Sequence, residues 1–486
     1  MGKHTGRFSI TIAFFSIVFI LYKTLFPFNF LFAETFSKSD HLFLILKLGK
    51  FYARDTTLNI LLFLPLGVSL TSYLIQKKKM TSLSVFGLVL LVSCGLSYSI
   101  EILQFFQPSR YASMNDVIAN STGGLLGYIF CRWKRLSLSG YFALAFITSI
   151  FLQMETSLSN WNKTFPLLLG NELTEDRPWE GYISKVYITD RALSNDELED
   201  AFSETFPADS INGSLLASYQ FSDKRDFNDK TGRFPSLIWM GKPGDVQEGK
   251  GIFLGPHHWL KSTSHAEYLT QRIIETSQFS LGVTVATDKT MQTGPARIVS
   301  LSADPRHRNF TLGQEESNLI FRLRTPLTGD NGGPDMIVRD LFTSPDRRNI
   351  IISYNGSVLK VYVDGIKTFH KFELSPGAVA FSYLYAINNL YPINISLLSV
   401  YKIIWYAIIF IPLGILVSLI NKIMNKHIIL ISGVILLPSF ILEGILVSVS
   451  GRDVILENLF ICILFTIIPV LLFKFARDPF ALRRSV

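Results

Sequence analysis

Apolar residues of this chain gather in two blocks, residues 8–153 and 393–474, on either side of a polar middle stretch. A helix that crosses a bilayer needs about 20 mostly apolar residues. Eight segments meet this need: 8–24, 57–75, 81–106, 114–131, 138–154, 397–420, 428–449 and 454–473. No small-residue cleavage site follows the first segment, which therefore indicates a retained anchor rather than a signal peptide. The pattern predicts an α-helical, multi-pass membrane protein.

Basic residues in the short loops predict how these helices cross the membrane. With the N-terminus inside, the inner loops hold 14 Lys and Arg residues and the outer short loops hold six. An excess of basic residues marks cytoplasmic loops. We therefore expect both termini to be cytoplasmic and residues 155–390 to be extracytoplasmic. The short apolar stretches 41–53 and 378–391 are expected to form interfacial helices on the outer surface.

The polar middle stretch, residues 156–376, shows short runs with alternating apolar positions between turn signals such as Asn355-Gly356 and Asp364-Gly365. Alternation with period two is typical of strands that bury one face. The expected strands include 181–188, 214–221, 279–287, 350–354 and 358–363. Many short strands of this kind predict an all-β sandwich.

Composition adds two limits. The net charge is +8. It lies mostly in short loops between apolar segments, which indicates membrane topology rather than nucleic-acid binding, so no nucleic-acid partner is expected. All three cysteines, Cys94, Cys131 and Cys462, fall in or beside apolar segments. The middle domain is therefore expected to have no disulfide bonds.

The same polar motif occurs twice within apolar surroundings. The first copy contains Pro65-Leu66-Gly67 and later Glu101, with Arg110 nine residues further on. The second contains Pro412-Leu413-Gly414 and Glu443, again with an arginine, Arg452, nine residues later. Charged residues in membrane segments are costly, so they are functional-site hypotheses by default.

Around Glu101 the spacing predicts a small polar cluster. Gln104 shares a helix face with Glu101. Arg110 falls in the following turn, and Asp116 and Asn120 lie on the next helix beside Gly123, Gly124 and Gly127, which let another helix approach closely. An internal ion pair and a ligand-binding or catalytic site both remain open as its role.

The strings NILLFLPLG, SIEILQFFQPSR and NDVIANSTGGLLGYIF resemble the VanZ-like membrane family over about residues 10–150. This family is named for a protein linked to teicoplanin resistance, and its recurring positions correspond to Glu101, Arg110, Asp116 and Asn120. The C-terminal block resembles a degenerate half-copy that keeps Glu443, Arg452, Asp453 and Asn458. There Leu446 replaces the glutamine, the arginine-to-asparagine distance shrinks from ten residues to six, and the glycines are absent.

The middle domain is similar to laminin-G and concanavalin A-like jelly rolls. Residues 179–194 resemble the closing strand and turn of such folds, residues 212–219 the opening strand, and residues 361–365 a late hairpin. Because the closing motif precedes the opening one, we interpret the order as a circular permutation. The expected domains are a five-span VanZ-like domain (1–154), the sandwich (155–378) and a three-span C-terminal block (379–486).

Folds of this class bind glycans or proteins, in some cases with calcium. Asp226, Asn228 and Asp229 are candidate calcium ligands, although a polar turn accounts for them equally. Tyr268, Trp239 and Trp259 are candidates for stacking on sugar rings. No Glu-x-Asp-x-Glu run occurs, which argues against a glycosidase, and no confident catalytic residue or other cofactor site emerges.

The sequence therefore predicts a cell-membrane protein that is not an enzyme and that presents a lectin-like domain outside the cytoplasm. The expected partners are the lipid bilayer and a glycan, a cell-wall precursor or a surface protein, in surface-polysaccharide biology or glycopeptide tolerance. The alternative is an intramembrane enzyme or transporter for lipid-linked sugar or phosphate substrates. In that case Glu101 acts as base or charge partner and Arg110 holds a phosphate.

Overall fold

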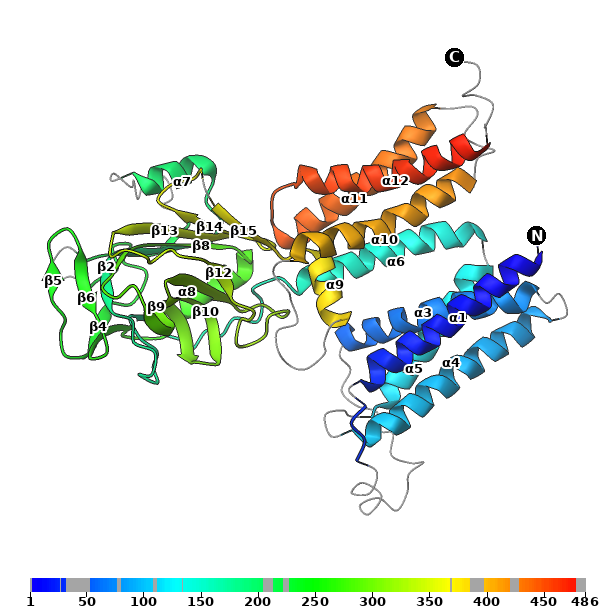
Figure 1. Ribbon diagram of the computed structural model, residues 1–486, viewed down its shortest axis with the longest axis horizontal. Coiled ribbons are helices and arrows are strands. Elements are labelled where there is room, and N and C mark those ends of the chain that lie inside the picture. Colours follow the sequence, from blue (N-terminus) through cyan, green and yellow to red (C-terminus); the bar gives the residue numbers. More distant parts are fainter. Residues whose placement is uncertain are drawn as a thin grey trace. The chain divides into compact units, whose positions relative to one another are not determined.

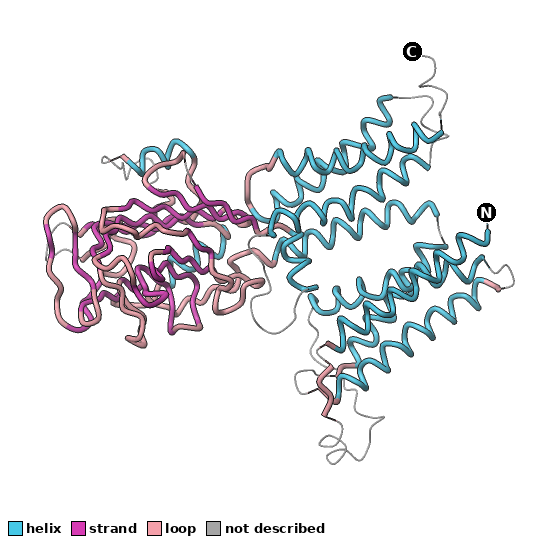
Figure 2. The backbone as a smooth tube through the Cα atoms, in the orientation of Figure 1, coloured by secondary structure: helices cyan, strands magenta, loops and turns pink. Residues whose placement is uncertain are grey.

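The computed structural model describes residues 2–26, 28–31, 53–76, 80–107, 112–132, 134–203, 213–221, 227–367, 369–384, 397–419 and 428–477. The chain divides into two compact units, Met1–Ile147 and Thr148–Val486, and each is described by itself. Within the described ranges, strands occur only in the second unit, between residues 167 and 373 (Figure 2).

The first unit consists of helices (Figure 1). They are α1 (Gly2–Leu25), α3 (Ala53–Gln76), α4 (Ser82–Phe105), α5 (Met114–Arg132) and α6 (Lys134–Met154), whose last residues belong to the second unit. Polar side chains join α4 to the end of α1, because Gln104 donates to the carbonyl of Thr24 at 2.8 Å and Gln107 donates to that of Leu25 at 2.6 Å.

Helix α3 packs closely against α5 through the glycines. A Cβ atom added to Gly67 would lie 2.1 Å from the carbonyl oxygen of Gly124, and one added to Gly127 would lie 2.6 Å from that of Leu64. Only residues without a side chain allow two backbones to approach this closely. The glycine face predicted on α5 is therefore the surface that contacts α3.

Each of the eight predicted spans falls on a described helix. Among the described residues, three helices are long and apolar enough to cross a membrane, with apolar windows Leu58–Ile75, Ser82–Phe105 and Leu398–Ile415. Four more helices carry shorter apolar stretches. The count of eight spans and the orientation of the termini stay predictions.

The second unit contains two antiparallel sheets. The seven-stranded sheet has the order β12 (Met336–Val338), β11 (Asn318–Leu323), β10 (His307–Glu316), β9 (Gln292–Asp304), β1 (Leu167–Leu169), β7 (His258–Ser262) and β4 (Leu237–Gly241). The eight-stranded sheet has the order β15 (Phe369–Glu373), β14 (Val358–Val363), β13 (Arg348–Tyr354), β8 (Phe279–Thr287), β2 (Gly181–Thr189), β6 (Gly251–Leu254) and β5 (Val246–Gln247), with β3 (Leu215–Gln220) also paired to β2.

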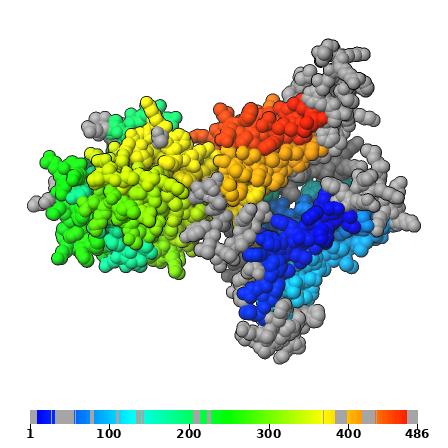
Figure 3. Space-filling view, in the orientation of Figure 1, coloured from blue at the N-terminus to red at the C-terminus, as the bar shows by residue number. Residues whose placement is uncertain are grey.

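One apolar core lies between the two sheets. It joins side chains such as Val299 and Phe310 of the first sheet to Val283 and Ile352 of the second. The same domain contains two short helices, α7 (Asn195–Phe202) between β2 and β3 and α8 (Glu267–Thr276) between β7 and β8. Figure 3 shows one face of this sandwich, coloured from teal through green to yellow along the chain.

The sequence correctly predicted an all-β domain and the positions of β2, β3, β8, β13 and β14. The strands interpreted as closing and opening are neighbours, since Lys185 of β2 lies opposite Gln220 of β3. A permuted order requires this adjacency. The jelly-roll identity and the permutation themselves stay predictions.

After the sandwich come α9 (Pro376–Leu384), α10 (Leu398–Leu419), α11 (Ile428–Ser450) and α12 (Leu456–Arg477). Helix α9 covers residues 378–384 of the interfacial segment expected at 378–391, and residues 385–391 lie outside the described residues. Of the other expected interfacial segment, 41–53, residues 41–52 also lie outside the described residues. Lys402 of α10, 2% exposed, forms ion pairs with Glu373 of β15 at 3.0 Å and with Glu457 of α12 at 3.1 Å. These pairs attach α10 to both the sandwich and α12.

The turn between α11 and α12 contacts two loops of the sandwich. Gln278 donates to the carbonyl of Gly451 at 2.8 Å. Gly356, in the predicted Asn355-Gly356 turn, has φ +89°, and a Cβ atom there would lie 2.2 Å from the carbonyl oxygen of Ser450. A glycine is therefore needed at this position both for the backbone conformation and for the close approach.

Candidate functional site

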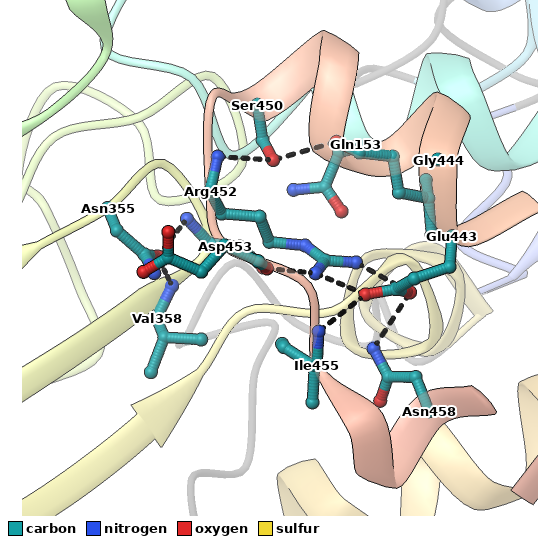
Figure 4. A network of polar contacts seen from close by, with 12 residues as sticks. Gln153, Asn355, Val358, Glu443, Gly444, Ser450, Arg452, Asp453, Ile455 and Asn458 are labelled. Carbon is teal, nitrogen blue, oxygen red and sulfur yellow. Dashed lines mark hydrogen bonds and ion pairs between the residues drawn. The ribbon is translucent and has the colours of Figure 1, made fainter. Parts of the chain in front are cut away.

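Glu443 forms the centre of the polar cluster in the second copy (Figure 4). Its carboxylate is 4% exposed and accepts two hydrogen bonds from the guanidinium of Arg452, at 2.5 and 2.9 Å. It also accepts from the backbone N–H of Ile455 at 2.8 Å and from Asn458 at 3.3 Å. Both carboxylate oxygens are thus fully used inside the protein, which is typical of a buried pair that holds a turn together.

Asp453, the remaining predicted member of this copy, takes part through its backbone only. The backbone carbonyl of Asp453 accepts a hydrogen bond from the guanidinium of Arg452 at 2.8 Å, and Asp453 is otherwise exposed. The structure therefore brings together three of the four residues of the second copy by their side chains.

In the first copy Glu101 is 2% exposed and accepts the backbone N–H of Ser113 at 2.8 Å. Twelve residues separate acceptor and donor, as they do for Glu443 and Ile455. The two helix turns are therefore built alike. Arg110 lies outside the described residues, so its predicted place beside Glu101 stays a prediction.

The remaining predicted residues of the first copy bind different partners. Asp116 accepts from Asn59 of α3 at 2.8 Å, and Asn120 donates to Ser97 of α4 at 2.8 Å. Gln104 points instead to α1. Side chains that the sequence grouped in one cluster thus join α5 to two neighbouring helices and α4 to α1.

The shared turn spacing gives a second way to match the residues of the two copies. The sequence comparison matched Asn458 with Asn120 and inferred a shortened spacing. Asn458 follows Ile455 by three residues, just as Asp116 follows Ser113, so Asn458 takes the place of Asp116. By the same register Cys462 takes the place of Asn120.

Two of the calcium candidates, Asn228 and Asp229, lie in a turn whose groups they bind. One oxygen of Asp229 accepts the backbone N–H of Ser218 at 2.7 Å, and the other accepts those of Arg233 and Phe234 at 2.9 and 3.0 Å. Asn228 accepts from Ser236, and Asp226 lies outside the described residues. In the described ranges, no group of three or more His, Cys, Asp or Glu side chains is arranged to hold a metal ion.

The sandwich has a groove beside α8 with a volume of about 460 Å³. Tyr268 lines it with 49% of its surface exposed. The residues that line the groove are Lys163, Arg233, Phe234, Pro235, Ser264, His265, Glu267, Tyr268 and Gln271. Of the aromatic residues considered for sugar stacking, Trp259 is 2% exposed, and Trp239 is half-buried and packs against Phe227 at the edge of the core. Tyr268 lines the groove beside α8.

Comparison with known proteins identifies one part of the chain. Residues 9–135 match the family model described as VanZ/LLP1. Together with the apolar helices, this match shows a membrane protein with a VanZ-like N-terminal region, as the sequence motifs predicted. No curated protein and no solved structure matches the chain.

Proposed function

We propose that this chain is a multi-pass protein of the cell envelope whose extracytoplasmic sandwich binds an acidic saccharide. The groove beside α8 carries the proposal. It combines one exposed aromatic ring, that of Tyr268, with basic side chains on segments far apart in sequence, Lys163 and Arg233. Ligand sites are concave, with apolar walls and a few convergent polar groups.

The charges of the groove favour an acidic ligand over a neutral one. Lys163 and Arg233 supply two positive charges and Glu267 one negative charge. Arg233 is positioned by a hydrogen bond from its Nη1 atom to the carbonyl of Leu215 at 3.2 Å. A uronate or phosphorylated sugar, as found in surface polysaccharides and cell-wall precursors, would place its ring on Tyr268 and its anion on these cations.

Replacing Tyr268 with alanine is expected to weaken binding of an acidic oligosaccharide about tenfold or more, because the exposed ring would no longer cover the sugar. The measurement is a titration of the purified full-length protein in detergent with a uronate-containing oligosaccharide. Its neutral counterpart serves as the second ligand. Phe369→Ala is the matched control, since that aromatic residue is 43% exposed on β15, outside the groove.

Equal affinity of the Tyr268 and Phe369 variants would place binding elsewhere on the sandwich. Absence of any saccharide binding by the unmodified protein would reject the proposal and favour a surface protein as the partner. Envelope biology, including glycopeptide tolerance, would then be tested by deletion rather than by ligand titration.

The rival function, an intramembrane enzyme or transporter, depends on Glu101. The parallel with Glu443 supports a structural role for this carboxylate, since both accept a backbone N–H from the following turn. We therefore expect Glu101→Gln to reduce the amount of folded protein in the membrane severalfold, because one acceptor in a buried polar contact is weakened. Normal abundance combined with lost survival under envelope stress would instead support the rival function.

A further inference from the structure

Arg308 of β10 is fully buried, and no part of its side chain is exposed. A guanidinium group carries five N–H donors and a positive charge. Its Nε, Nη1 and Nη2 atoms have no hydrogen-bond partner in the part of the chain that the structure describes. A buried charge without a partner is costly, so this position calls for a specific explanation.

The strand register shows where this side chain points. Arg308 lies opposite Ser302, whereas Phe310 lies opposite Leu301 in the core between the sheets. Neighbouring residues of β9 point to opposite faces, so Ser302, next to Leu301, faces away from that core, and Arg308 opposite it does the same. The β-bulge between Arg308 and Phe310 lets these two residues of β10 face opposite sides. Their face is nevertheless buried. The segment 324–335 reaches this face, because Arg322, opposite Thr311, donates to Asn331 at 3.2 Å and to Asp335 at 3.0 Å. The backbone N–H of Arg308 also donates to the carbonyl of Asp330 at 3.0 Å.

Nearby charges do not neutralise Arg308. Arg297 pairs with Glu172 at 3.2 Å, with both side chains at most 1% exposed, and Arg322 pairs with Asp335. Both carboxylates are therefore already engaged by other arginines. Three guanidinium groups and two carboxylates leave one positive charge without a counterion.

Arg308 nevertheless remains charged at neutral pH. Burial, followed by the repulsion of Arg297 and Arg322, lowers the pKa of Arg308 to about 9.

We propose that Arg308 binds a small oxyanion, a phosphate, sulfate or carboxylate group, beneath the segment 324–335. An oxyanion can accept two parallel N–H bonds from the planar guanidinium and supplies the missing negative charge. Thr311 offers a further donor on the same face, because it lies opposite Ser300 and its buried hydroxyl has no partner among the described residues. This site is separate from the groove beside α8 and does not depend on the proposed function.

The test is thermal unfolding of the full-length protein in detergent, followed by tryptophan fluorescence. Four of the six tryptophans lie in the sandwich domain, at positions 161, 179, 239 and 259. Inorganic phosphate or sulfate is titrated against chloride at constant ionic strength. We expect phosphate or sulfate to raise the Tm with the logarithm of its concentration above the dissociation constant, by about 5 °C or more at a hundredfold excess.

Arg308→Met should abolish this anion-dependent rise, and the exposed neighbour Arg306→Met should retain it. If the methionine variant does not fold, Arg308→Lys keeps the charge without the planar fork and should weaken the anion effect about tenfold. Glucose 1-phosphate distinguishes the source of the group: a rise equal to that with phosphate indicates a larger ligand, and no rise indicates a free ion.

No anion-dependent rise in the unmodified protein would overturn the proposal. An equal rise in Arg308→Met would overturn it as well, since the anion would then bind elsewhere.

Discussion

Replacing Glu443 with glutamine is expected to destabilise the pairing of α11 and α12 by about 3–5 kcal/mol. The substitution leaves the Arg452 guanidinium, 3% exposed, without its counterion. It also weakens the acceptor for the backbone N–H of Ile455. Removing one partner of a buried pair is costly because the other charge remains buried and unpaired.

The measurement is the Tm of the full-length protein in detergent, together with its abundance in the membrane. The double variant Glu443→Leu with Arg452→Met removes both charges and is expected to be much closer to the unmodified protein. Asp453→Asn is the matched control, because that side chain is exposed in the same turn. A stable, abundant Glu443→Gln variant with altered function would show that the carboxylate acts on a ligand rather than holding the turn.

Replacing Gly67 with leucine is expected to separate α3 from α5 and to reduce folded protein severalfold. Even a single added Cβ atom would lie 2.1 Å from the carbonyl oxygen of Gly124, and this backbone atom cannot move aside as a flexible side chain could. Overpacking in a close-packed interior costs about 1–3 kcal/mol and occasionally more. The loss of folded protein should appear in the amount of monodisperse protein extracted from the membrane.

Gly87→Leu and Gly95→Leu on α4 are matched controls, because an added Cβ atom at either position meets nothing within 4 Å. Both should leave the yield nearly unchanged. If Gly67→Leu gave the same yield as these controls, the close contact of α3 and α5 would not be required for folding.

The local pattern of apolar and polar residues was sufficient to predict the long helices and five of the strands. Apolar runs of about 20 residues predicted the long helices, and alternation with Asn-Gly and Asp-Gly turns predicted β2, β3, β8, β13 and β14. The glycines of α5 predicted a close helix contact, although not its partner α3. These features depend on period and on single-residue properties, which are visible without knowledge of distant contacts.

The predicted polar cluster shows the limit of spacing arguments. Glu101 and Gln104 share a helix, yet Glu101 binds the turn before α5 whereas Gln104 reaches α1. Periodicity states which face a residue occupies but not which helix lies against that face. Likewise, Asp229 resembled a calcium ligand in sequence, and only the fold revealed that backbone N–H groups use both of its oxygens.

The sequence did not predict the groove beside α8 or the buried arginine side chains. Tyr268 was one aromatic candidate among several, and its exposure depends on how α8 lies beside Arg233 and Lys163. Arg308 would be assigned to a solvent-facing position by its residue type. The only sequence signal was an arginine on each of three consecutive strands, β9, β10 and β11.

The sequence by itself determined that this is a membrane protein with an inserted β-domain, since apolar length and local alternation encode both. Its motif strings carried the resemblance to the VanZ-like family, and the spacing of its residues showed the repeated Glu-Arg motif. Only the tertiary structure decided that Glu443 is fully hydrogen-bonded and that Arg308 is buried without a partner among the described residues. The physical reason is that burial and hydrogen-bond satisfaction depend on groups brought together from distant parts of the chain, and no local pattern specifies those neighbours.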